Sequence, residues 1–96
     1  MRNLYLVAYD ISDPKRLRKI FKTMKGYGTR IQYSVFYCYL SNKEKVILIA
    51  YIDDIIDHKS DRVIIVNLGS EERSTEEKIE FLGQKMNISD HEAIIV

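Results

Sequence analysis

The feature that most limits the fold is a run of six apolar residues, from Leu4 to Tyr9, near the start of the chain. Successive side chains of a strand point to opposite faces of a sheet, so a strand that is apolar throughout needs cover on both faces. The run therefore predicts a central strand, and it is followed directly by Asp10. The chain has 96 residues, which is enough for a single domain, 1–96, and too short for two.

A helix is expected after this strand, and it carries most of the positive charge. Asp13 is a suitable N-cap, Pro14 suits the first helical position, and Gly26 is a natural C-cap. The apolar residues that recur at helical spacing are Leu17, Ile20, Phe21 and Met24. The basic residues on the rest of the surface are Lys15, Arg16, Arg18, Lys19, Lys22 and Lys25.

The rest of the sequence, from Arg30 onward, predicts further strands and another helix. In the stretch from Arg30 to Leu40, alternate residues would form the two faces of a strand, and both faces carry apolar side chains. This pattern predicts one long strand. The sequence of 41–44 has the form of a capping box, so a helix is expected to begin there. Further strands are expected over 62–68 and 79–82, and the apolar tail 93–96 needs the edge of a sheet, its own or a partner's.

This order of elements indicates an α+β fold of the ferredoxin-like kind, βαββαβ, with an extra C-terminal strand. Two helices cover one face of such a sheet and leave the other face open. Because the strands are apolar on both sides, we expect a second copy to pack sheet to sheet as a homodimer. The tail 84–96 is expected to complete a sheet edge of the partner protomer.

Composition excludes several classes of protein. The single cysteine, Cys38, cannot form an intrachain disulfide, which favours a reducing, cytoplasmic setting. No apolar run is long enough to span a membrane, and no phosphate-binding glycine loop is present. The net charge of +1 hides an asymmetry, because residues 1–40 carry eight Lys or Arg but two acidic residues. This basic half suggests a polyanion-binding face, although a solvated helix surface explains it equally well.

Three groups of residues are candidates for chemistry. Asp10 leaves the sheet at a strand end, where a carboxylate can bind a hard cation such as Mg²⁺ or simply cap the following turn. The basic helix can contact phosphates without reading sequence. Ser34 and Phe36 share one strand face and either line a nucleotide site, with Phe36 stacking on a base, or belong to the core.

The residues of the first half resemble the CRISPR-associated protein 2 family. The resemblance rests on the strand that ends in Tyr9-Asp10, on Arg16 and Arg18, and on the Gly-x-Arg-x-Gln-x-Ser-Val-Phe pattern over 28–36. The segments 61–63 and 82–83 and the apolar tail are also similar to the family, so the likeness spans almost the whole chain.

The resemblance implies a homodimer in which Asp10 of each protomer binds Mg²⁺ and acts in catalysis. It implies an endonuclease on single-stranded RNA or double-stranded DNA, and a place in spacer acquisition beside a CRISPR integrase subunit. The positions that match residues supporting activity or nucleic-acid contact are Tyr9, Arg16, Arg18, Arg30, Ser34 and Phe36.

Two other readings remain open at the level of the sequence. One is a non-catalytic DNA-binding scaffold dimer that bridges integrase dimers, and a single carboxylate per chain suits it. The other is a toxin-type ribonuclease on the same fold, which the Gln32-x-Ser34-Val35-Phe36 motif does not exclude.

Overall fold

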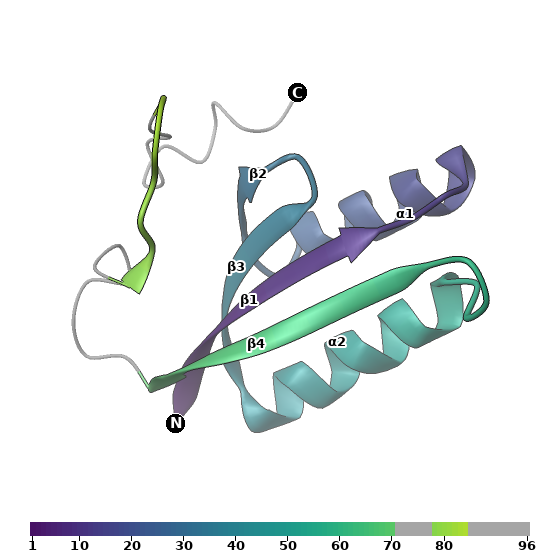
Figure 1. Ribbon diagram of the computed structural model, residues 1–96. Coiled ribbons are helices and arrows are strands. Elements are labelled where there is room, and N and C mark those ends of the chain that lie inside the picture. The colour runs from purple at the N-terminus through teal and green to yellow at the C-terminus, as the bar shows by residue number, and fades with distance from the viewer. Residues whose placement is uncertain (71–77, 85–96) are drawn as a thin grey trace.

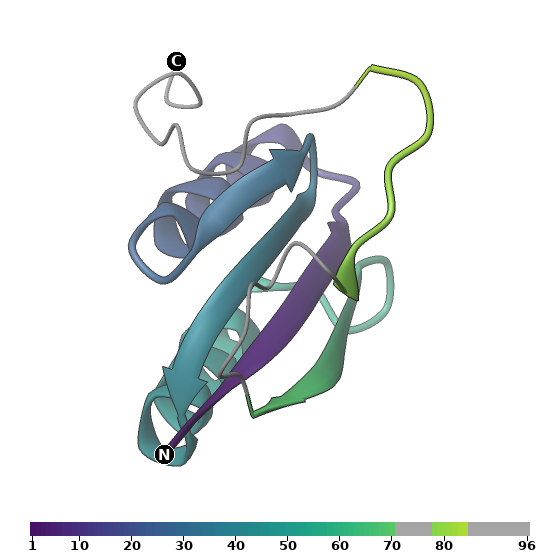
Figure 2. The same ribbon diagram turned by 90° about the vertical axis from the view of Figure 1, so that its left-hand side faces the viewer.

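The computed structural model describes residues 1–70 and 78–84, which form one antiparallel sheet and two helices (Figure 1). The elements in chain order are β1 (Arg2–Asp10), α1 (Pro14–Lys25), β2 (Thr29–Gln32), β3 (Val35–Ser41), α2 (Asn42–Ile55) and β4 (Arg62–Ser70). The strand order is β2-β3-β1-β4. Both helices lie on the same side of the sheet (Figures 1 and 2). The predicted α+β, ferredoxin-like architecture is therefore confirmed.

The strand β1 is central, as its apolar sequence predicts. It pairs antiparallel with both β3 and β4, so that Val7 lies opposite Phe36 on one side and Ile65 on the other. The core lies between the sheet and the helices. Its fully or nearly fully buried members are Tyr5, Val7, Tyr9, Ile11, Ile20, Met24, Phe36, Cys38, Leu40, Leu48 and Ile52. Burial there raises the pKa of the Cys38 thiol to about 12, so this thiol stays protonated.

The helix boundaries agree with the capping signals in the sequence. Asp13 accepts a hydrogen bond from the backbone N–H of Arg16, Pro14 opens α1 and Gly26 is its C-cap. At α2 the Ser41 hydroxyl accepts from the backbone N–H of Glu44, and the Glu44 carboxylate accepts from the backbone N–H of Ser41. This reciprocal pair is the expected capping box.

The prediction of one long strand over Arg30 to Leu40 was wrong. The chain turns at Tyr33 and Ser34, so that β2 and β3 form an antiparallel hairpin in which Gln32 lies opposite Val35. The strand-like pattern of side chains continues through the turn. The turn contains no glycine, proline or asparagine, the residue types that usually mark a hairpin. The turn follows from tertiary packing, because β2 can pair antiparallel with β3 at the edge of the sheet only if the chain reverses between them.

The predicted short strand over 79–82 is also absent. These residues are irregular in the structure, and no strand among the described residues pairs with them. A strand needs a hydrogen-bonded neighbour, and a segment of four residues does not supply one by itself. Of the tail predicted over 84–96, residues 85–96 lie outside the described part of the chain.

The face of the sheet opposite the helices keeps apolar residues in contact with solvent. Val63 and Ile65 pack on the core, so the alternating residues Ile64 and Val66 point to the other face, where they are 53% and 41% exposed. Asp10 and its cross-strand neighbour Arg62 lie on this open face too. Neither described helix has the length and apolar character that crossing a membrane requires.

Gly28 marks a close approach between the end of α1 and β3, and it yields a test of the packing. A Cβ atom there would lie 2.4 Å from both Cys38 Sγ and the backbone carbonyl oxygen of Tyr37. Because the backbone cannot move aside easily, we expect Gly28→Ala to lower the free energy of unfolding by about 1–3 kcal/mol. Urea denaturation measures this.

The matched control is Gly26→Ala, whose Cβ would meet its nearest neighbour, the Thr23 carbonyl oxygen, at 3.4 Å. This variant is expected to stay close to the parent protein. Equal unfolding midpoints for the two alanine variants would contradict the close packing at Gly28.

Candidate active site

Asp10 is the last residue of β1, and its side chain is exposed. The carboxylate forms no hydrogen bond or ion pair with any other residue that the structure describes. Its neighbour across the sheet is Arg62 of β4, and directly opposed residues of an antiparallel pair have Cβ atoms about 5 Å apart. The side chain is therefore available to a ligand and has a cation close by.

The backbone on both sides of Asp10 is held firmly. The backbone N–H of Tyr9 donates to the carbonyl oxygen of Ser34 at 3.0 Å, which ties β1 to the hairpin turn. Ile11 is buried, and the backbone N–H of Ser12 donates to Asp61 Oδ1 at 3.0 Å. The chain thus presents a free carboxylate on a fixed backbone, an arrangement suited to binding without large ordering costs.

Asp61, which directly precedes β4, holds the turn that follows Asp10. Its side chain is fully buried, and its two oxygens accept from Arg16 Nε at 2.7 Å and Arg16 Nη2 at 3.2 Å. It also accepts from the backbone N–H of Asp57 at 2.8 Å and from the Ser12 hydroxyl at 3.2 Å. This set of donors joins the β1–α1 turn to the α2–β4 turn.

The Arg16–Asp61 pair is electrostatically stable. The hydrogen bond from Arg16, aided by the backbone N–H groups of Asp57 and Ser12, lowers the pKa of the Asp61 carboxyl far below its usual range, against the opposing effect of desolvation. The same hydrogen bond raises the pKa of Arg16. Both groups therefore remain charged at any pH near neutrality.

A hollow of about 520 Å³ opens beside Asp10. Three elements and the hairpin turn form its walls. The lining residues are Tyr9, Asp10 and Ile11 of β1 and its end, Leu17, Arg18 and Phe21 of α1, Arg30 of β2, and Tyr33 and Ser34 of the turn. Apolar walls with two guanidinium groups and one carboxylate suit a ligand that is both flat and negatively charged.

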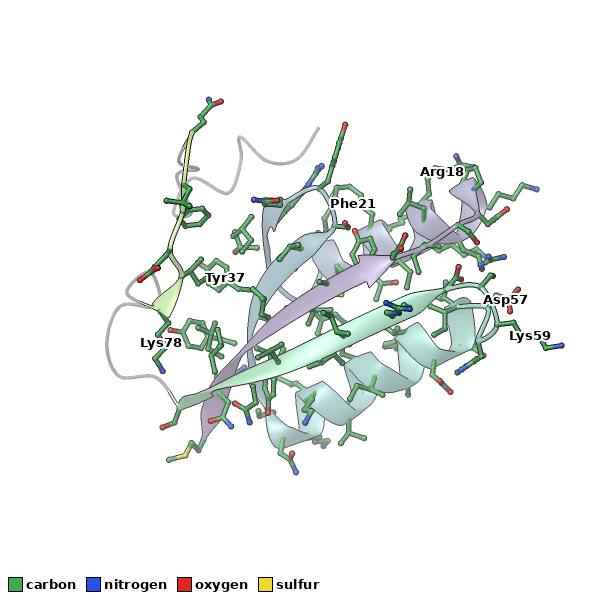
Figure 3. The ribbon with its side chains drawn as sticks, in the orientation of Figure 1. Arg18, Phe21, Tyr37, Asp57, Lys59 and Lys78 are labelled. Carbon is green, nitrogen blue, oxygen red and sulfur yellow. The ribbon has the colours of Figure 1, made fainter. Side chains whose placement is uncertain are left out.

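The two arginines of the hollow differ in their contacts. Arg18 is exposed and pairs with no other residue in 1–70 or 78–84. The Arg30 guanidinium carbon lies 5.0 Å from the ring centroids of both Phe21 and Tyr33, and its Nε donates to the Gln32 carbonyl oxygen at 3.3 Å. Figure 3 shows Arg18 near the start of α1 and Phe21 reaching from α1 toward the β2–β3 hairpin.

Comparison with known proteins identifies the family of this chain. The family model described as CRISPR associated protein Cas2 matches residues 2–76. This chain belongs to the Cas2 family.

Individual relatives match over the whole chain. The Rhodospirillum rubrum protein named CRISPR-associated endoribonuclease Cas2 1 is 40% identical over 96% of this chain and 89% of its own. The Geobacter sulfurreducens protein named CRISPR-associated endoribonuclease Cas2 is 38% identical over the full length of both chains. The crystal structure of Streptococcus pyogenes Cas2 at pH 6.5 matches with a TM-score of 0.71 at 33% identity, covering 83% of this chain and 99% of that one.

The residues carried over from the Cas2 resemblance fall into different environments. Phe36 is completely buried and packs between Tyr9 and Phe21, with ring centroids 6.3 Å and 5.9 Å away. It therefore belongs to the core and cannot stack on a base. Tyr9 is also buried, and desolvation raises the pKa of its hydroxyl while the charge of Arg30 opposes this. Both residues support the walls of the hollow.

Arg16 forms an ion pair with Asp61, so Arg16 contributes by holding the turn beside Asp10 in place. The role of Asp61 itself was missed in the sequence analysis. The one available signal was its place in the segment 61–63, which is similar to the family. Ser34 is half-buried and contributes its backbone carbonyl to Tyr9.

The Asp61 network predicts a specific pH dependence of stability. An aspartate in an unfolded chain titrates near pH 3.9, and the folded pKa of Asp61 is lower. The stabilisation is therefore complete above about pH 4 and is lost as the pH falls through the folded pKa. We expect Asp61→Asn to unfold at lower urea concentration than the parent from pH 5 to 8. The difference between the two unfolding midpoints is expected to narrow below about pH 4.

The control is Asp54→Asn, which changes an exposed carboxylate of α2 that has no partner among the described residues. Its unfolding midpoint is expected to follow the parent at every pH. A gap between Asp61→Asn and the parent that stays constant down to pH 2 would contradict the role of the ion pair.

Proposed function

We propose that this protein is a Mg²⁺-dependent endoribonuclease that works as a homodimer in the cytoplasm, with Asp10 of each copy as the metal ligand and catalytic residue. The observation that carries the proposal is the exposed Asp10 carboxylate on a fixed backbone, beside a hollow lined by Arg18 and Arg30. Within residues 1–70 and 78–84 this carboxylate has no hydrogen-bond or ion-pair partner. The two relatives described above are both named endoribonucleases, which supports RNA as the substrate class.

The donor set fits Mg²⁺ in a particular way. Among the described residues, no group of three or more His, Cys, Asp or Glu side chains could hold a metal ion. Mg²⁺ commonly uses one or two carboxylates and completes its shell with water and substrate phosphate oxygens. Asp10 supplies one such carboxylate, and Mg²⁺ bound there would supply activated water and charge stabilisation for phosphodiester hydrolysis.

A second copy would improve the site. Asp10 lies on the open face of the sheet, together with the exposed apolar residues Ile64 and Val66. A twofold dimer packed through this face would bury the apolar residues and bring a second carboxylate toward the first.

The protein's own residues would place the nucleic acid. The helix α1 has six basic side chains and no acidic residue over Pro14–Lys25. Because Arg16 is occupied by Asp61, the free guanidinium nearest to the hollow is that of Arg18. We assign Arg18 to a phosphate of the substrate and the neighbouring lysines of α1 to the strand that leads away from it.

The nuclease proposal predicts a large effect of changing Asp10. Purified protein with Mg²⁺ is expected to cleave end-labelled single-stranded RNA, and Asp10→Ala is expected to lower the rate by more than about 100-fold, because the metal's stabilisation is worth several kcal/mol. EDTA should abolish cleavage by the parent protein. Duplex DNA is tested in parallel, since the family resemblance includes it as a substrate.

The control for this measurement is Asp54→Ala, which removes an exposed carboxylate of α2 and should cleave like the parent. Retention of nucleic-acid binding by Asp10→Ala would show that the loss concerns catalysis. Equal cleavage by Asp10→Ala and the parent would overturn the proposed catalytic role.

The single carboxylate per chain favours one alternative, a DNA-binding scaffold dimer that bridges integrase subunits without cleaving DNA. In that case the basic side chains of α1 would bind the phosphates of the DNA. We expect Arg18→Glu to weaken binding to duplex DNA and to reduce the salt dependence of binding, because one phosphate contact is lost. Fluorescence anisotropy at several salt concentrations measures both effects.

The matched charge reversal is Lys43→Glu in the first turn of α2, away from the hollow. If both reversals weaken binding equally, the effect reflects net charge and not a phosphate contact at Arg18. Undiminished binding by Asp10→Ala together with absence of cleavage by the parent would favour the scaffold over the nuclease.

A further inference from the structure

Tyr33 is the most unusual side chain in the hollow. It lies in the two-residue turn between β2 and β3, and it is 85% exposed although it is a large aromatic residue. Most of the large aromatic side chains on the neighbouring strands are mostly or completely buried, as are Tyr9 and Phe36. An exposed aromatic ring at a defined position beside a charged site is typical of a binding surface.

The ring is held in place by a three-layer stack. Phe21, which is partly buried against the core, forms the inner layer, the Arg30 guanidinium lies over it, and Tyr33 forms the outer layer, with 5.0 Å between the guanidinium carbon and each ring centroid. Arg30 is fixed further by its hydrogen bond to the Gln32 carbonyl oxygen. A cation between two rings contributes favourably to each contact, so the outer ring is positioned before any ligand arrives.

The stack has one unused aromatic face. The inner face of Tyr33 is in contact with Arg30, and the large exposed fraction of the residue leaves its other face open to solvent. Flat π-systems are the ligands that add to such a stack. Unpaired nucleobases stack on Tyr, Phe and Arg in single-strand-binding proteins, whatever their sequence.

The surroundings favour a nucleobase over other flat ligands. Tyr33 lines the same hollow as Asp10 and Arg18, so a base on the ring would have its phosphate close to a cation and to the carboxylate. The positive charge of α1 complements the backbone of a nucleic acid. A base inside a duplex cannot reach the ring without leaving its stack, which costs free energy.

We propose that Tyr33 and Arg30 form a stacking subsite for one unpaired nucleobase next to Asp10, which makes the site selective for single-stranded RNA over duplexes. This inference rests on the proposed nuclease function for its choice of ligand. Tyr33 is then a specificity-determining residue that binds substrate and takes no part in proton transfer or metal binding.

The test measures binding and stacking directly and without turnover. A short single-stranded RNA with 2-aminopurine flanked by uridines is titrated with protein in EDTA, because the fluorescence of 2-aminopurine is quenched when the base stacks. The parent protein is expected to bind and to quench. Tyr33→Ala should lose the quenching and bind about 5- to 100-fold more weakly, the loss that one stacked base accounts for.

Three controls make the result specific. Tyr33→Phe keeps a ring at the same position and is expected to bind and quench like the parent. Tyr51→Ala removes another exposed tyrosine, on α2, and should have no effect. Duplex RNA of the same sequence should bind equally to the parent and to Tyr33→Ala. Circular dichroism checks that each variant is folded.

The outcomes separate this subsite from the nuclease proposal. Unchanged quenching by Tyr33→Ala, or an equal loss on single-stranded and duplex RNA, overturns the subsite even if the parent cleaves RNA in Mg²⁺. Tyr33-dependent quenching without cleavage in Mg²⁺ supports the subsite and removes the nuclease function. Failure of the parent protein to bind single-stranded RNA at all overturns both.

Discussion

The buried carboxylate of Asp61 is the interaction on which the geometry of the site depends. A charge removed from water is tolerated only when donors surround it, and Asp61 receives hydrogen bonds from Arg16, Ser12 and Asp57. These donors come from the β1–α1 turn, α1 and the α2–β4 turn. One side chain thus fixes the relative position of three segments. One of these segments is the β1–α1 turn, which directly follows Asp10.

The consequence for function is a separation of tasks between two aspartates. Asp61 is occupied completely and is kept charged by its neighbours, so it has no capacity left for a ligand. Asp10 has no partner among the described residues, and the neighbours that hold its backbone leave its carboxylate free. A metal ligand needs this combination of fixed backbone and available oxygen atoms. In the function we propose, the hollow beside it would add what one carboxylate lacks, namely cations for phosphate groups and an aromatic surface for a base.

The environments of the family-matched residues explain how one motif serves several purposes. Phe36 and Tyr9 fill the core beneath the hollow, and Arg16 holds the turn, so a change at any of these three acts on the shape of the site. Arg18 has no partner among the described residues, and we assign it to substrate binding only as part of the proposal. Arg30 belongs to both groups, because it contacts the partly buried Phe21 and the exposed Tyr33. Loss of activity in a variant is therefore not by itself a sign of contact with nucleic acid.

Local signals in the sequence determined the elements whose causes are local. The caps at Asp13 and Ser41 and the continuous apolar run of β1 depend on neighbouring residues alone, so both helix starts and the central strand could be predicted. The β2–β3 turn could not, because alternation continues through Tyr33 and Ser34 and only pairing across the sheet reveals the reversal. The same holds for the site. Asp10 was visible at the end of a strand. The partnership of Asp61 with Arg16 joins residues 45 positions apart, and the stack at Tyr33 needs the β2–β3 turn and the packing of α1 on the sheet, so only the tertiary structure reveals either contact.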